Sequence, residues 1–138
     1  MVLNNDMILK IIGDNKRFRN PFDEPQGYTI IDRIDSLNEE FETELINLYY
    51  EKLRYAACHA DKLIESAFDD KFYNFYGVDR TFVNSLTQMC SELYFDSFVM
   101  SCEDHIIGSC LTNEKFMFGH FIEVTWDSNW KIRYVWIN

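Results

Sequence analysis

The chain lacks the glycine-rich signatures that mark common nucleotide and acyl-transfer sites. Its five glycines form neither G-x-G-x-x-G nor G-x-x-x-x-G-K-[ST], the loops that bind dinucleotides and nucleoside phosphates. The nucleophile elbow G-x-S-x-G is absent as well. No motif therefore argues for catalysis, and we expect a protein that is not an enzyme and holds no cofactor.

Signatures of metal binding, secretion and membrane insertion are also missing. No C-x-x-C pair occurs among the cysteines, which are Cys58, Cys90, Cys102 and Cys110. No run approaches the ~18 apolar residues of a transmembrane helix. The start, MVLNNDMILK, lacks the basic segment and apolar run of a signal peptide. We expect a cytoplasmic protein with reduced thiols and no metal or membrane association.

Basic residues are few relative to acidic ones. Thirteen Lys and Arg stand against twenty-three Asp and Glu, for a formal net charge of −10. A field of that sign repels nucleic acid phosphates and anionic membranes, whereas it attracts basic proteins and speeds their docking. Solubility alone is the alternative explanation of the charge.

Hydrophobic and aromatic residues, in contrast, are abundant. They make up 47% and 17% of the 138 residues, with twelve Phe, eight Tyr and three Trp. The composition excludes a disordered chain, and the length predicts one domain over residues 1–138. Because so many rings exceed the need of a small core, we expect some Tyr or Trp at the surface for recognition.

The N-terminal part predicts short strands followed by a long helix. Residues 7–12 and 28–34 are short apolar runs typical of strands, and the loop between them holds both prolines. The capping box Ser36-Leu37-Asn38-Glu39 begins an amphipathic helix of about thirty residues, with one break. The aromatic segment 68–77 ends at a helix-stopping Gly77, and Asp79 caps a second helix that continues to Leu93.

From residue 94 onward the hydrophobic period changes to two. Strands are expected at 95–101, 105–111, 116–126 and 130–137, joined by short polar turns that favour an antiparallel meander. In the last strand, Ile132, Tyr134, Trp136 and Ile137 are assigned to the drier face, and Lys131, Arg133 and Val135 to the wetter one. The predicted fold is α+β: a long N-terminal helical region packed on a C-terminal four-stranded antiparallel meander.

Acidic residues concentrate around the start of the long helix. Six carboxylates in thirteen residues form a candidate surface for Arg and Lys of a partner: Asp32, Asp35, Glu39, Glu40, Glu42 and Glu44. The alternative is that a helix N-terminus favours acids through its macrodipole, which explains Asp35 and Glu39 well. Of Tyr49 and Tyr50, at most one is expected to face the core fully, which leaves the other exposed.

Other polar groups carry weaker predictions. Cys58, His59 and Asp61 are poorly placed for a metal, because neighbours on a helix point in different directions. His105 and His120 lie on the predicted sheet with Cys102, Cys110 and Asp104, but a Cys–His nucleophile needs two close side chains and a third group to orient the base, which strand alternation does not establish. General-base candidates by position are Asp96, Glu123 and Asp127.

The run Phe118-Gly119-His120-Phe121-Ile122-Glu123-Val124, with Trp130-Lys131-Ile132 after it, is similar to a G-H-x-I-x-V strand pattern. That pattern resembles one found among immunity proteins of bacterial polymorphic toxin and contact-dependent growth inhibition systems. The resemblance covers about twenty residues and implies an intracellular antitoxin that binds one toxin domain and blocks its active site.

We therefore expect an immunity protein that neutralises a cognate toxin domain, a basic nuclease, through an acidic surface. The predicted toxin-binding residues are Glu39, Glu40, Glu42, Glu44, Glu51 and Tyr50. The alternative is a small enzyme or ligand-binding domain with a helix-lined sheet pocket. A third interpretation is an adaptor that works as a homodimer.

Overall fold

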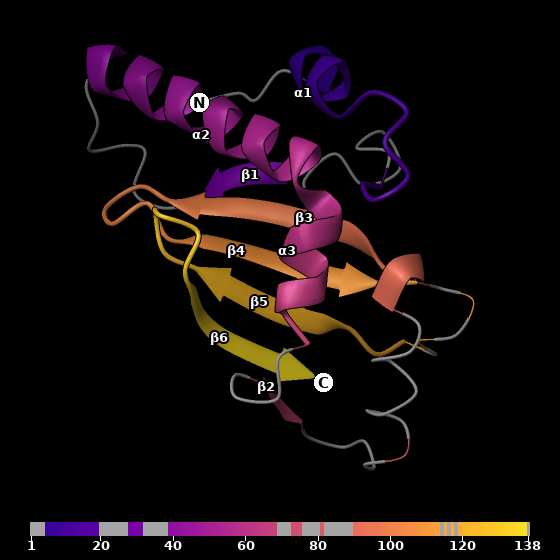
Figure 1. Ribbon diagram of the computed structural model, residues 1–138. Coiled ribbons are helices and arrows are strands. Elements are labelled where there is room, and N and C mark those ends of the chain that lie inside the picture. The colour runs from indigo at the N-terminus through magenta and orange to yellow at the C-terminus, as the bar shows by residue number, and fades with distance from the viewer. Residues whose placement is uncertain are drawn as a thin grey trace.

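The computed structural model describes residues 5–19, 28–31, 39–68, 73–75, 90–113 and 119–137, with residues 81, 115 and 117. Its helices are α1 (Asn5–Ile12), α2 (Glu39–Cys58) and α3 (Ala60–Ser66), with a 3₁₀ turn at Cys90–Glu92. The strands are β1 (Tyr28–Ile31), β2 (Tyr73–Phe75), β3 (Tyr94–Ser101), β4 (Ile107–Thr112), β5 (Ile122–Trp126) and β6 (Ile132–Ile137). Figure 1 shows these elements along the chain.

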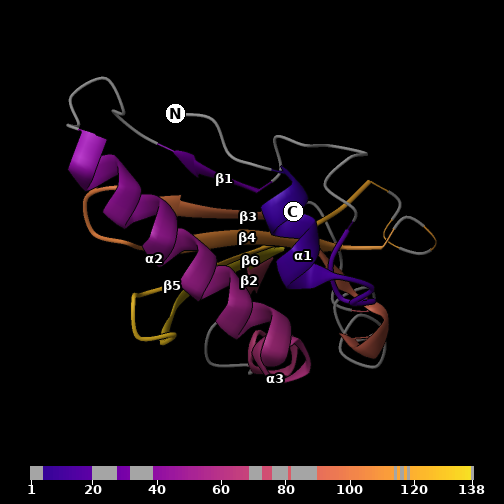
Figure 2. The same ribbon diagram turned by 90° about the horizontal axis from the view of Figure 1, so that it is seen from above.

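The six strands form one mixed sheet in the order β1-β3-β4-β5-β6-β2. Strands β3 to β6 pair antiparallel with their sequence neighbours, which confirms the α+β class and the predicted meander. The short strands β1 and β2 add to its two edges and pair parallel with β3 and β6. All three described helices lie on one face of the sheet (Figures 1 and 2).

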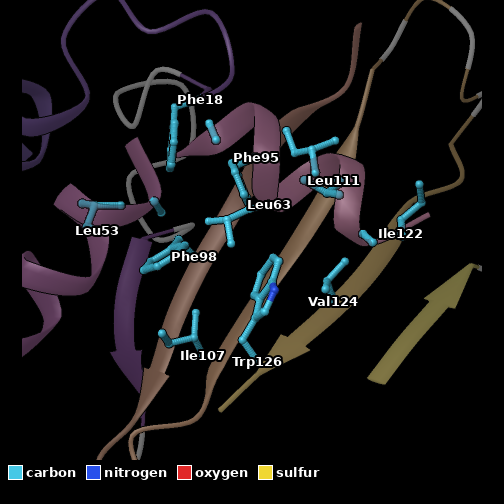
Figure 3. Packing of buried hydrophobic residues seen from close by; sticks show 14 of the residues in the cluster. Phe18, Leu53, Leu63, Phe95, Phe98, Ile107, Leu111, Ile122, Val124 and Trp126 are labelled. Atoms are coloured by element: carbon cyan, nitrogen blue, oxygen red, sulfur yellow. The ribbon is translucent and has the colours of Figure 1, made fainter. Parts of the chain in front are cut away.

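The core fills the space between these helices and the sheet. A bulge at Asp96 lets Phe95 and Phe98, three residues apart, both point to the helix side. The ring of Trp126 on β5 lies 6.2 Å from that of Phe95, and Val124 belongs to the same core (Figure 3).

The long helix was predicted with one break, and the structure confirms it. Helix α2 ends at Cys58 and α3 begins at Ala60, so the break lies at His59. Backbone hydrogen bonds continue across it, from the His59 amide to the Tyr55 carbonyl at 3.0 Å and from the Leu63 amide to the His59 carbonyl at 2.9 Å. The capping box at Ser36 lies outside the described residues.

Two local predictions are wrong, and a third is wrong only at its described end. Residues 7–12 belong to helix α1, because Ile8 and Ile12, four residues apart, share a buried side while Met7 and Lys10 are exposed. Tyr73–Phe75 is a strand that pairs with β6, not part of a helix. The predicted helix from Asp79 to Leu93 falls largely outside the described residues, and Cys90–Glu92 is a 3₁₀ turn.

Two residues of β6, Tyr134 and Trp136, lie on the opposite face from the prediction, whereas Ile132 and Ile137 face the core as predicted. Val135 and Ile137 are buried under the helices, whereas Tyr134 is 39% exposed and lies on the other face. The register explains this arrangement, since Val135 pairs with buried Val124, and Tyr134 pairs with Thr125. The assignment of Tyr134 and Trp136 to the drier face was therefore wrong, because aromatic residues also pack on the outer surface of a sheet.

Candidate binding surface

Helix α2 exposes a row of side chains that includes two of the predicted carboxylates. Glu44 and Glu51 are exposed and lie seven residues apart, so they share one side of the helix about 10 Å apart along its axis. Tyr55, four residues after Glu51, continues the row and is 37% exposed. We call these three residues the α2 stripe.

The remaining predicted residues lie elsewhere or are not described in full. Glu42 is half-buried and points toward the packed side of α2, two residues from Glu44. Glu39 and Glu40 are the first two residues of α2, and their side chains lie outside the described set, as do Asp32 and Asp35. The structure thus brings together Glu44 and Glu51.

The expectation of an exposed Tyr50 is wrong. Tyr50 is 2% exposed and Tyr49 is 0% exposed, so both rings are in the core, with their centroids 5.9 Å apart. The Tyr49 hydroxyl donates a hydrogen bond of 2.9 Å to the Phe98 carbonyl of β3. The exposed tyrosine of this helix is Tyr55.

Tyr55 belongs to a stack of three aromatic rings that sequence reasoning missed. Its ring lies 4.8 Å from that of Trp130 and 4.1 Å from that of His59, with interplanar angles of 20° and 21°. We call His59, Tyr55 and Trp130 the ring stack. The spacing of Tyr55 and His59 by four residues was a signal for their contact, but the approach of Trp130 depends on the tertiary fold.

Trp130 packs against two other aromatic rings, and its backbone adopts an unusual conformation. Its ring centroid lies 6.2 Å from that of Phe98 and 5.8 Å from that of Trp126. The residue has φ of 66°, in the left-handed region that is a genuine exception for a bulky side chain. Such strain persists only where the surroundings fix it.

The surrounding turn supplies those constraints. The Asp127 carboxylate accepts hydrogen bonds of 2.8 Å and 2.9 Å from the amides of Asn129 and Lys131. These bonds, that from Lys131 first, lower the pKa of Asp127. Lys52 of α2 donates to the Ser128 carbonyl, which ties the turn to the helix. The ring stack is therefore preorganised on the protein surface.

Two arginines near the N-terminus, Arg17 and Arg19, are engaged in internal contacts. Arg17 donates to the carbonyls of Cys90 and Ser91, and its Nε lies 3.3 Å from a carboxylate oxygen of Asp61. Arg19 pairs with Asp96, one of the general-base candidates. These contacts join the N-terminal segment to α3 and β3 and leave the two guanidinium groups largely neutralised.

The other catalytic and metal candidates gain no organised site. Glu123 is exposed on the face of the sheet opposite the helices, and Asp127 lies in the β5–β6 turn. Among the described residues, no group of three or more His, Cys, Asp or Glu side chains is arranged to hold a metal ion. Within the same residues, no helix combines the length and apolar character needed to cross a bilayer.

The α2 stripe and the ring stack together form a surface with carboxylates at one end and rigid aromatic rings at the other. Such a surface is suited to contacts with a cationic protein. Comparisons with protein-family models, curated proteins and solved structures return no match to this chain.

Proposed function

We propose that this protein binds a basic protein domain and neutralises it, as an immunity protein does with its cognate toxin. The observation that carries the proposal is the alignment of Glu44 and Glu51 with the ring stack on one exposed side of α2. A cationic nuclease domain is the partner class that this charge favours. The proposed place of action is the cytoplasm.

Charge and rings have separate roles in this proposal. A net charge of −10 raises the local concentration of a basic partner and speeds its docking, while the local carboxylates select the orientation. The rings supply the contact area that slows dissociation, since Trp and Tyr are frequent hot spots. Because Trp130 and Tyr55 are already stacked, little side-chain freedom is lost when a partner covers them.

Affinity capture from the native bacterium tests the proposal. The tagged full chain serves as bait at low and high salt, and bound proteins are identified by mass spectrometry. We expect one basic domain of a larger secreted protein, with recovery reduced by salt. Purified partner then shows whether binding inhibits its activity. If the folded bait retains no basic protein at low salt, or if binding leaves the partner's activity intact, the proposal fails.

A charge-reversal pair locates the contact. Glu44→Lys with Glu51→Lys should reduce association with the partner by about tenfold and flatten its salt dependence. The matched control is Glu65→Lys with Glu92→Lys, which makes the same change in net charge at two exposed residues of α3 and the 3₁₀ turn. Equal effects of the two pairs would show that the α2 stripe is not the contact.

A further inference from the structure

The face of the sheet opposite the helices carries two rows of side chains that the α2 surface does not use. The register aligns Ser97, Cys110, Glu123 and Trp136 across β3 to β6. The next row is Val99, Gly108, Thr125 and Tyr134. We call these eight positions the open face.

Gly108 creates a hollow in the middle of the open face. It has no side chain between Val99 of β3 and Thr125 of β5, its partners in the register. A Cβ built on Gly108 would lie 3.4 Å from a Val99 methyl group, which is an ordinary contact, so the glycine is not required by crowding. The resulting depression has a volume of about 190 Å³ and is lined by residues of both rows, including Cys110 and Glu123.

Two stacked aromatic rings lie beside this hollow, on the neighbouring strand β6. The rings of Tyr134 and Trp136 lie 5.7 Å apart with an interplanar angle of 16°. Thr125 and Glu123 are their neighbours on β5, so the exposed carboxylate of Glu123 stands directly across from Trp136. A flat aromatic surface beside a carboxylate is the arrangement that a guanidinium group matches, because it stacks and pairs at once.

The electrostatics of the open face favour a cation. None of its eight residues is basic. Burial first, and then the charges of Glu123 and Asp96, raise the pKa of the Cys110 thiol. Glu123 also contributes, after desolvation, to the raised pKa of Tyr134. Burial is the larger cause of both shifts, and Glu123 adds to each, so this carboxylate contributes negative potential at the hollow. The geometry already described supplies the rings and the space.

We propose that the open face binds an arginine side chain of a basic partner protein. The aliphatic stem occupies the hollow above Gly108, and the guanidinium group pairs with Glu123 and lies against the Tyr134–Trp136 stack. Arginine is preferred to lysine because its planar group stacks on rings and pairs with a carboxylate through two N–H groups. The identity of the occupant as part of a basic protein rests on the proposed function.

Peptide titration tests the site without the partner. The ¹⁵N-labelled full chain is titrated with acetyl-Gly-Arg-Gly-amide and, separately, with the lysine counterpart. We expect saturable shifts of the Gly108, Cys110 and Glu123 amides and the Trp136 indole, with arginine bound at least about threefold more tightly than lysine. No saturable shifts, shifts centred elsewhere, or equal binding of the two peptides would overturn the proposal.

Two variants locate the contact. Glu123→Gln should weaken the arginine peptide at least about threefold, because the exposed charge pair is lost. Gly108→Val should weaken it by filling the hollow, with an unchanged amide spectrum elsewhere as proof of folding. Glu65→Gln, on α3 and outside both proposed contacts, is the control and should leave the titration unchanged. Unaltered affinity in Glu123→Gln would refute the assignment.

Failures of the two proposals are distinguishable. If the protein binds the arginine peptide at the open face but captures no basic partner, the proposed arginine site stands and the proposed function fails. If the protein captures a basic partner through the α2 stripe but shows no peptide shifts on the open face, the proposed function stands and the proposed arginine site fails.

Discussion

At the scale of single residues, burial decided the role of each aromatic side chain in ways that type and spacing did not. Tyr50 and Tyr55 lie on the same helix, but the first is 2% exposed and the second 37%. The difference comes from which side of α2 faces the sheet. The recognition surface therefore includes Tyr55 and Trp130, while Tyr49 and Tyr50 are part of the core.

The hydroxyl of Tyr49 links α2 to the centre of the sheet. Its hydrogen bond to the Phe98 carbonyl is fully buried. Tyr49→Phe should lower the free energy of unfolding by about 1 kcal/mol, because a buried hydrogen bond is lost while the ring packing remains. Urea unfolding followed by tryptophan fluorescence measures this. An unchanged transition midpoint would show that the bond contributes nothing to stability.

Cys110 reports the field of the open face. Since burial and nearby carboxylates raise its pKa, less thiolate is present at any given pH, and alkylation should be slow. The pH midpoint of its alkylation should lie above that of a free cysteine, and Glu123→Gln should move this midpoint downward. Mass spectrometry of iodoacetamide-treated protein gives the rate for each cysteine, with exposed Cys58 as the internal reference. A midpoint unaffected by Glu123→Gln would remove Glu123 as a source of the field.

At the scale of elements, the polar side chains of Asn15 and Asp127 fix the positions of the helices and of the β5–β6 turn around the candidate surfaces. Asn15 follows α1 and donates a hydrogen bond of 2.9 Å to the Ala57 carbonyl near the end of α2. Its side-chain oxygen accepts from the Arg17 amide at 2.9 Å. One residue thus joins α1, α2 and the segment at Arg17 that pairs with β3.

Replacement of Asn15 tests that link. Asn15→Ala should lower the free energy of unfolding by about 1–2 kcal/mol, because both partners lose a hydrogen bond in a half-buried site. Asn47→Ala, at an exposed position in the middle of α2, is the matched control and should change it by less than about 0.5 kcal/mol. Chemical denaturation measures both variants, and similar losses in the two would contradict the assigned role of Asn15.

The β5–β6 turn should be sensitive to acid. The folded state lowers the pKa of Asp127, chiefly through the hydrogen bond from the Lys131 amide. Its ionised form therefore stabilises the fold above about pH 4, the pKa range of an unfolded Asp. This contribution is lost as pH falls through the lower pKa of the folded state.

Asp127→Asn removes the titrating group and retains an oxygen acceptor. At neutral pH the wild-type protein should be the more stable of the two, and the difference should shrink on acidification from about pH 5 to pH 2. Urea unfolding across that range measures it. A stability difference that stays constant with pH would contradict the lowered pKa.

At the scale of the whole molecule, net charge and local contact should affect different rate constants. The charge of −10 acts over the distance that salt allows, about 10 Å at 0.1 M. Reversal of Glu65 and Glu92, away from the α2 stripe, should slow association with a basic partner modestly and leave dissociation unchanged. Surface plasmon resonance at two salt concentrations separates these effects, and faster dissociation in that control pair would place the contact elsewhere.

The sequence by itself determined the class of fold and the balance of charge. Short polar turns between runs of period two leave an antiparallel meander as the local choice, and the amphipathic pattern specifies α2 and α3 on either side of one break. The exposure of Glu44 and Glu51 also follows from helical spacing. These features depend on neighbours within a few residues of one another.

Tertiary structure decided the features that depend on distant partners. The apolar run 7–12 suits a strand or a helix, and only packing makes it α1. Parallel pairing of β1 with β3 and of β2 with β6 joins segments far apart in the chain. The face of β6 that meets the helices, the burial of Tyr50 and the approach of Trp130 to Tyr55 follow from the same arrangement. Period and spacing encode no contact between remote segments, so the two proposed binding surfaces emerge only once the sheet and its helices are assembled.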